Sequence, residues 1–141
     1  MSPIQIWFVD DREDNLQTWR DSFPEAVKKE CCLRCFSSIG SVEQALSEGF
    51  NPDILFLDFF VGDRYGFELV RQFPPDMPKR PVLIAHSSME LANTGLVNNG
   101  ADFAMEKIKE VPVTDSIVSR IQSMEDIQFI LTHKKLPARA F

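Results

Sequence analysis

Three aspartates stand at the ends of two apolar runs in this chain. Asp10 and Asp11 follow residues 4–9, and Asp58 follows residues 54–57. Nearly continuous apolar runs of this length are typical of parallel strands that are covered on both faces. Carboxylates at the ends of buried strands are costly unless positive charge lies among them. If these strands end at one edge of a sheet, the trio predicts a site for a hard divalent cation such as Mg2+.

Other polar residues follow the remaining apolar runs. In open α/β sheets a ligand binds outside the carboxyl ends of the strands, so these residues are candidates for the same site. The candidates are His86, Ser87 and Ser88 after residues 82–85, and Lys107 after residues 103–105.

Acids, a hydroxyl and a lysine on one rim indicate phosphoryl chemistry. Acids that bind Mg2+ prepare a clamp on phosphoryl oxygens, and one carboxylate can attack phosphorus to become an acyl phosphate. Lys107 and a serine hydroxyl would neutralise and hydrogen-bond the phosphoryl oxygens. Asp58 stands alone on its strand and therefore suits the nucleophile better than the adjacent pair does.

The apolar pattern alternates between short runs and helix-like stretches. This alternation predicts an α/β fold with a doubly wound, five-stranded parallel sheet and an extended C-terminal helix. The expected strands are 4–9, 31–37, 54–57, 82–85 and 103–105, and the expected helices are 12–23, 41–47, 66–73, 90–98 and 114–132.

Length and charge limit the classes of function. A chain of 141 residues suits one domain, which we expect over residues 1–132, followed by a basic tail at 133–141. The net charge of −6 argues against non-specific binding to nucleic acid or to anionic membranes. No apolar stretch approaches the roughly 20 residues that cross a bilayer, and the first residues lack a secretory pattern. We therefore expect a cytoplasmic location.

Two further features have a structural and a functional interpretation. Residues Ile127, Phe129 and Ile130 extend the apolar part of the last helix beyond the stripe through Met124, Gln128 and Leu131. They either wrap further round the core or form a surface for a partner, which leaves a homodimer through the C-terminal helices possible. Cys31, Cys32 and Cys35 are either a soft-metal or redox group or buried small apolar residues. Three ligands fall short of the usual zinc set, which favours burial.

The ordered motifs resemble the receiver domain of two-component response regulators, in the CheY-like superfamily with its flavodoxin-like (βα)5 fold. The resemblance covers roughly residues 4–125. It rests on Val9-Asp10-Asp11, on Asp58 followed eight positions later by Gly66-Phe67-Glu68-Leu69, and on Gly100-Ala101-Asp102 with Lys107 seven after the glycine.

The resemblance implies a role for each site residue. Asp58 accepts the phosphoryl group, Asp10 and Asp11 position Mg2+, and the backbone carbonyl of Phe60 completes the metal ligands. Lys107 pairs with the phosphoryl group. The donor is a phosphohistidine on a sensor histidine kinase or a phosphotransfer protein, and a downstream protein target reads the phosphorylated state.

Some positions depart from the family pattern. Gly62 replaces a common proline, Ile108 follows Lys107 where proline is usual, and Ala104 holds the place of the aromatic switch residue. At the hydroxyl position, direct counting gives His86 and a shift of one residue gives Ser87. We favour Ser87, because a short hydroxyl fits the chemistry.

Other functions remain open beside a phosphorylation-switched module that performs only its own phosphorylation and dephosphorylation. The departures would suit a degenerate receiver that binds proteins without taking phosphate. A haloacid-dehalogenase-like phosphatase is disfavoured because its two aspartates lie two apart, whereas Asp10 and Asp11 are adjacent. A flavodoxin-like nucleotide binder is disfavoured because no glycine-rich loop follows the first strand.

Overall fold

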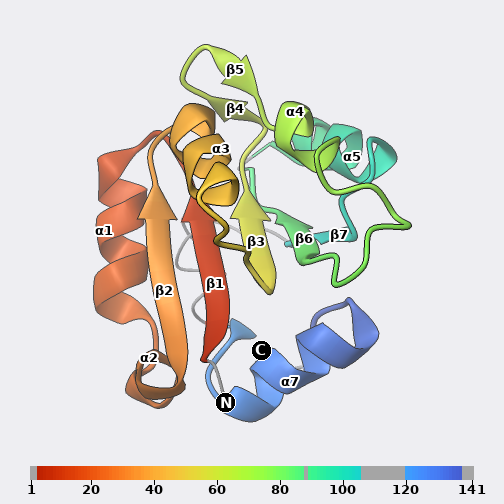
Figure 1. Ribbon diagram of the computed structural model, residues 1–141. Coiled ribbons are helices and arrows are strands. Elements are labelled where there is room, and N and C mark those ends of the chain that lie inside the picture. The colour runs from red at the N-terminus through yellow and green to blue at the C-terminus, as the bar shows by residue number, and fades with distance from the viewer. Residues whose placement is uncertain (1–2, 88, 106–119, 138–141) are drawn as a thin grey trace.

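The structure, a computed structural model, describes residues 3–87, 89–105 and 120–137. Its main feature is a parallel sheet of five strands in the order β2-β1-β3-β6-β7, which confirms the predicted doubly wound fold. Figure 1 shows β1 and β3 at its centre. The strands are β1 (Ile4–Val9), β2 (Cys31–Phe36), β3 (Ile54–Leu57), β6 (Val82–Ala85) and β7 (Phe103–Ala104).

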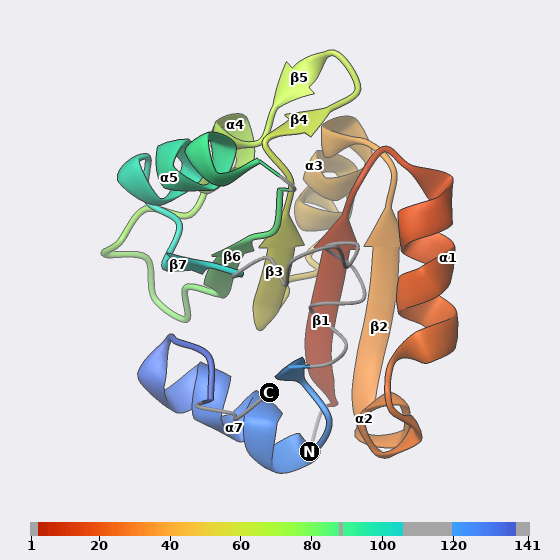
Figure 2. The same cartoon turned by 180° about the vertical axis from the view of Figure 1, so that it is seen from behind.

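Helices cover both faces of this sheet. The packing clusters place α1, α2 and α7 on one face and α3, α4 and α5 on the other, as Figures 1 and 2 show from opposite sides. The helices are α1 (Glu13–Ser22), α2 (Glu25–Glu30), α3 (Ile39–Ser47), α4 (Phe67–Val70), α5 (Glu90–Asn98) and α7 (Met124–His133).

The central strands separate two apolar cores. Successive side chains of a strand point to opposite faces, so Phe8 and Phe56 pack beneath α1 while Trp7 and Leu55 pack beneath α3. The Trp19 ring stacks on Phe8 with centroids 4.9 Å apart. Burial on both faces explains why these strands lack the alternation of a half-exposed sheet.

A buried ion pair fastens the proline-rich loop before β6. The Arg80 guanidinium lies 2.9 Å from the Asp102 carboxylate, with side chains 7% and 15% exposed. Arg80 also donates to the carbonyl oxygens of Phe73 and Gly100, and Asp102 accepts from the backbone N–H of Leu83. These bonds join the ends of α4, α5 and β6 on one side of the sheet.

The sequence pattern missed two short elements. The chain forms α2 after Pro24, and it forms a small antiparallel hairpin from β4 (Phe60–Val61) and β5 (Arg64–Tyr65). Helix α4 is shorter than the expected 66–73, because the chain leaves regular helix after Val70. Neither short element has enough residues to show a period.

The prediction of one continuous helix over 114–132 is wrong where the structure describes it. The Ser123 side chain accepts from the backbone N–H of Asp126, and Asp126 accepts from the backbone N–H of Gln122, so α7 begins at Met124. Ile127 and Ile130 are buried in the core, as one of the two interpretations expected, and Met124 and Leu131 of the expected stripe pack against the same core, whereas Gln128 is exposed. Residues 114–119 lie outside the described part.

The cysteines lie along β2 as free thiols, and Cys31 is buried. The Cys31 Sγ lies 3.6 Å from the sulfur of Met124 on α7. Burial raises the pKa of Cys31 to about 11, and the nearby charges of Glu30 and Asp53 add to the rise. Within the described residues no helix has the length and apolar character needed to span a bilayer.

Removing one partner of the buried ion pair leaves the other charge uncompensated. We expect Asp102→Ala to lower the free energy of unfolding by about 3–5 kcal/mol in urea denaturation. The matched control is Glu13→Ala, which breaks the exposed Arg20–Glu13 pair and should cost at most about 1 kcal/mol. Equal effects of the two variants would contradict the structural role of the buried pair.

The buried Cys31 thiol should make stability depend on alkaline pH. An unfolded thiol ionises near its ordinary pKa of 9.0, whereas the folded one keeps its proton to about 11. The unfolded state therefore loses its proton first, and the free energy of unfolding falls by about 2–3 kcal/mol between these pH values. In urea denaturation across this range Cys31→Ala should show a shallower decline than the wild type, and a parallel decline would refute the assignment.

Candidate functional site

The register of the central strands brings polar residues into one row. Val9 pairs with Leu57 and Leu57 with Ala85, so Asp10, Asp58 and His86 come next on three adjacent strands. The backbone N–H of His86 donates to the carbonyl oxygen of Leu57, which continues the ladder past the end of β6. The three side chains therefore meet at the carboxyl edge, as the sequence predicted for the aspartates.

The three aspartates form a compact group of oxygen ligands. One carboxylate oxygen from each of Asp10, Asp11 and Asp58 lies within 4.8 Å of the others. Asp10 is fully buried, Asp58 is half-buried and Asp11 is exposed. Hard oxygen ligands in this number suit Mg2+ or Ca2+, with water or substrate completing the coordination.

Asp10 is held in place by the start of α1. Its Oδ1 accepts the backbone N–H of Arg12 at 2.8 Å, and its Oδ2 accepts from Nδ2 of Asn15 at 2.9 Å. These bonds orient a buried carboxylate toward its neighbours and supply part of the solvation it has lost. The sequence analysis did not name Asn15 as a site residue, although its position five residues after Asp10, in the first turn of a helix, could have suggested this contact.

Burial and the neighbouring negative charges disfavour the ionised form of Asp58. Burial raises the pKa of Asp58 above its ordinary value, and the neighbouring charges of Asp10 and Asp11 raise it further. His86 and the backbone N–H of Phe59, which donates to Oδ1 at 2.8 Å, act in the opposite direction. A divalent cation among the three carboxylates would stabilise their charged forms.

The hairpin after Asp58 forms a hydrogen bond with the acidic group. Gly62 begins its two-residue turn at φ 65°, where glycine is favoured, and the Gly62 N–H donates to Oδ2 of Asp11 at 3.0 Å. The position where the resembled family pattern has proline thus holds a turn glycine here. The sequence analysis did not predict this hairpin.

Gly66 closes the hairpin against the site. Its N–H donates to the carbonyl oxygen of Phe59 at 2.7 Å. A Cβ at Gly66 would overlap the backbone carbonyl of Asp58, so the backbone can approach this closely only with glycine.

His86 and Ser87 occupy different environments. His86 is fully buried, stacks on Phe8 with centroids 4.6 Å apart, and its Nε2 lies 3.1 Å from the carbonyl oxygen of Val9. A ring nitrogen this close to a carbonyl carries the proton and donates it. The Ser87 Oγ instead accepts the backbone N–H of Met89, and its backbone bonds with the side chain of Asn93. The geometry therefore places His86 on the strand next to Asp58, and the assignment of Ser87 to the hydroxyl position stays a prediction.

The remaining predicted residues are partly described. Phe60 begins β4, and the metal role of its carbonyl stays a prediction. Phe103 and Ala104 pack on opposite faces of the sheet, as expected for a regular strand. The Phe103 ring therefore does not lie on the face where the family pattern has its aromatic residue. Lys107 and Ile108 lie outside the described residues, as does Ser88.

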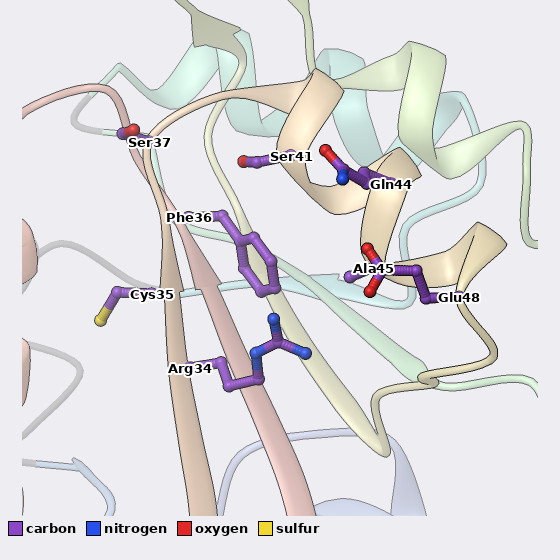
Figure 3. A pocket seen from close by; sticks show the side chains of 8 residues that line it. All are labelled: Arg34, Cys35, Phe36, Ser37, Ser41, Gln44, Ala45 and Glu48. Atoms are coloured by element: carbon purple, nitrogen blue, oxygen red, sulfur yellow. The ribbon is translucent and has the colours of Figure 1, made fainter.

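A separate pocket of about 350 Å3 lies between β2 and α3 (Figure 3). The Arg34 guanidinium projects toward it and lies over the rings of Phe36 and Phe50 at 4.9 and 5.1 Å. The pocket shares no residue with the aspartate group.

Several solved structures that resemble this fold are response regulators or their receiver domains. The response regulator DrrB, a Thermotoga maritima OmpR/PhoB homolog, matches with a TM-score of 0.63 and 17% identity, covering 99% of this chain and 58% of that one. The chain thus spans somewhat over half of that regulator. A signal receiver domain from Bermanella marisrubri matches with a TM-score of 0.63 and 21% identity, covering 85% of this chain and 96% of that one.

A third structure was determined with ligands. A response regulator from Burkholderia pseudomallei, with a phosphorylated aspartic acid, a calcium ion and citrate, matches with a TM-score of 0.60 and 16% identity. The match covers 97% of this chain and 77% of that one. No protein-family model and no curated protein matches the sequence. The chain has the fold of CheY-like response regulator receiver domains, as the sequence motifs predicted.

The close approach at Gly66 gives a specific test of the site geometry. We expect Gly66→Ala to lower the free energy of unfolding by about 1–3 kcal/mol because the methyl group displaces the Asp58 backbone. Mg2+ binding by calorimetry should weaken roughly tenfold, as when the support of a metal ligand is lost.

The matched control for this variant is Gly40→Ala in α3, where a Cβ meets nothing within 4 Å. It should leave Mg2+ affinity unchanged and stability unchanged or up to about 1 kcal/mol higher. Unchanged Mg2+ affinity in Gly66→Ala would contradict the role of this contact.

Proposed function

We propose that this protein is a response regulator receiver module that accepts a phosphoryl group on Asp58 in a Mg2+-dependent reaction. The observation that supports this most strongly is the convergence of Asp10, Asp11 and Asp58 at the carboxyl edge of a receiver-type sheet. Phosphorylation alters which proteins the module binds.

The acidic group fits the cation. Asp10, Asp11 and Asp58 would hold Mg2+, and the carbonyl of Phe60 would add a further oxygen ligand. When bound, the cation neutralises the carboxylates and draws charge from the phosphoryl oxygens. Asn15 and the backbone N–H groups of Arg12 and Gly62 keep the two flanking carboxylates oriented.

The transfer is a displacement at phosphorus. A carboxylate oxygen of Asp58 forms a bond to phosphorus as the P–N bond of a phosphohistidine donor breaks, and the departing imidazole keeps that electron pair. The product is an acyl phosphate, and its hydrolysis by water returns the carboxylate and releases phosphate. Lys107 pairs with the phosphoryl oxygens, and His86 follows the strand next to that of Asp58.

The partners follow from this chemistry. The donor is a sensor histidine kinase or a histidine phosphotransfer protein, and the output is a downstream protein rather than nucleic acid or membrane. The module is residues 1–132, it acts in the cytoplasm, and the basic residues 133–141 form a tail. A homodimer through the C-terminal helices belongs to the same proposal.

A phosphorylation-independent scaffold is the second candidate. The observation that favours it is the buried His86 beside Asp58, where a small hydroxyl would serve the phosphoryl group more directly. Ala104 supports it too, since no switch aromatic stands at that position. The intact acidic group favours the first proposal.

Phosphorylation with a small acyl-phosphate donor distinguishes these two functions. With Mg2+ and acetyl phosphate, we expect the wild type to gain the mass of one phosphoryl group and Asp58→Asn to gain none, because the nucleophile is lost. The matched control Asp63→Asn, at the hairpin turn, should still be phosphorylated. A wild type that gains no Mg2+-dependent mass would favour the scaffold, and a modified Asp58→Asn would place the acceptor elsewhere.

A further inference from the structure

The β4–β5 hairpin lies beyond the carboxyl edge of the sheet (Figure 1), and several aromatic rings contact one another on it and beside it. The Phe59 ring meets Phe60 and Tyr65 edge-on, with centroids 4.8 and 5.7 Å apart, and Tyr65 stacks on Phe67 at 5.1 Å. The hairpin register pairs Phe60 with Tyr65, so their rings lie on one face. Both rings are exposed, Phe60 by 51% of its surface.

The apolar surface continues onto α5. A Cβ at Gly95 would lie 3.3 Å from the Phe59 ring, so this ring packs closely against the helix. Leu91, one helical turn earlier on the same face, is 84% exposed, and Met89 is exposed beside it. We call these residues the aromatic surface: Phe59, Phe60, Tyr65, Phe67, Met89 and Leu91. Exposed apolar patches of this kind mark binding sites.

Ion pairs hold this surface in a fixed shape. The Arg64 guanidinium, on β5, bonds with Glu43 of α3 and with Glu68 of α4. Glu68 also accepts the backbone N–H of Tyr65 at 2.9 Å. Because the rings are positioned before any partner arrives, binding need not pay the entropy of ordering them.

The charge around the aromatic surface indicates what can bind it. Asp63 and Glu90 are exposed at the hairpin turn and at the start of α5. The cation of Arg64 is already paired with two glutamates, and Arg71 lies over the Phe67 ring. This rim repels a second copy of a chain with net charge −6 and attracts a cationic partner.

We propose that the aromatic surface docks a segment of a partner protein that carries apolar side chains flanked by lysine or arginine. The apolar side chains cover Phe60, Tyr65 and Leu91, and the cations meet the acidic rim. This surface lies on the hairpin and the start of α5, beside the acidic group but outside it. The proposal therefore goes beyond phosphoryl transfer and does not depend on it.

A labelled amphipathic peptide of leucine and lysine tests this proposal on the full chain by fluorescence anisotropy. We expect binding that weakens with added salt, and no binding of a leucine and glutamate peptide of the same length. Phe60→Ser and Leu91→Ser should each weaken binding about tenfold, the effect of losing an apolar anchor. Backbone NMR shifts on peptide addition should concentrate at residues 60–65 and 89–91.

The matched control is Phe50→Ser, because Phe50 is also 51% exposed but lies near Arg34, away from the hairpin. It should bind the basic peptide as the wild type does. Equal losses in Phe50→Ser and Phe60→Ser, shifts spread over the whole surface, or equal binding of the acidic peptide would overturn the proposal. Self-association of the wild type that Phe60→Ser abolishes would assign the surface to a second copy instead.

Discussion

Repulsion among three carboxylates at the ends of buried strands is the constraint on which the site depends. Asp10 and Asp58 lie side by side because β1 and β3 pair in register, and Asp11 joins them from the following loop. Their charges and their burial act together to disfavour ionisation of Asp58. A site of this kind is stable in its charged form when a cation is present, which links the fold to ion binding.

The surroundings of the carboxylates explain how the chain tolerates this repulsion. Asn15 and the backbone N–H groups of Arg12, Phe59 and Gly62 each donate to one of the aspartates. One of these donors belongs to the β4–β5 hairpin, so the same bonds that stabilise the acids also position the aromatic rings. The acidic group and the exposed surface beside it are therefore parts of one local structure.

Burial patterns explain which elements could be predicted. Strands 54–57 and 82–85 and helix 90–98 match the structure to the residue, because continuous apolar runs and a terminal glycine mark them clearly. The β4–β5 hairpin and α2 were missed, since strands of two residues and a helix of six are too short to show a hydrophobic period. Helix α7 begins at Met124, inside the expected helix over 114–132, because the Ser123 side chain accepts the N–H of Asp126 in its first turn. An apolar stripe gives no sign of such a helix start.

The sequence by itself determined the parallel sheet and the three aspartates at its edge, because apolar runs and strand-end acids are local features of the chain. Tertiary structure alone placed the buried His86 on the strand next to Asp58, because the register between strands cannot be read from either strand by itself. It also decided that Gly62 and Gly66 tie the hairpin to the acids, since hydrogen bonds and close approach between distant residues leave no periodic pattern.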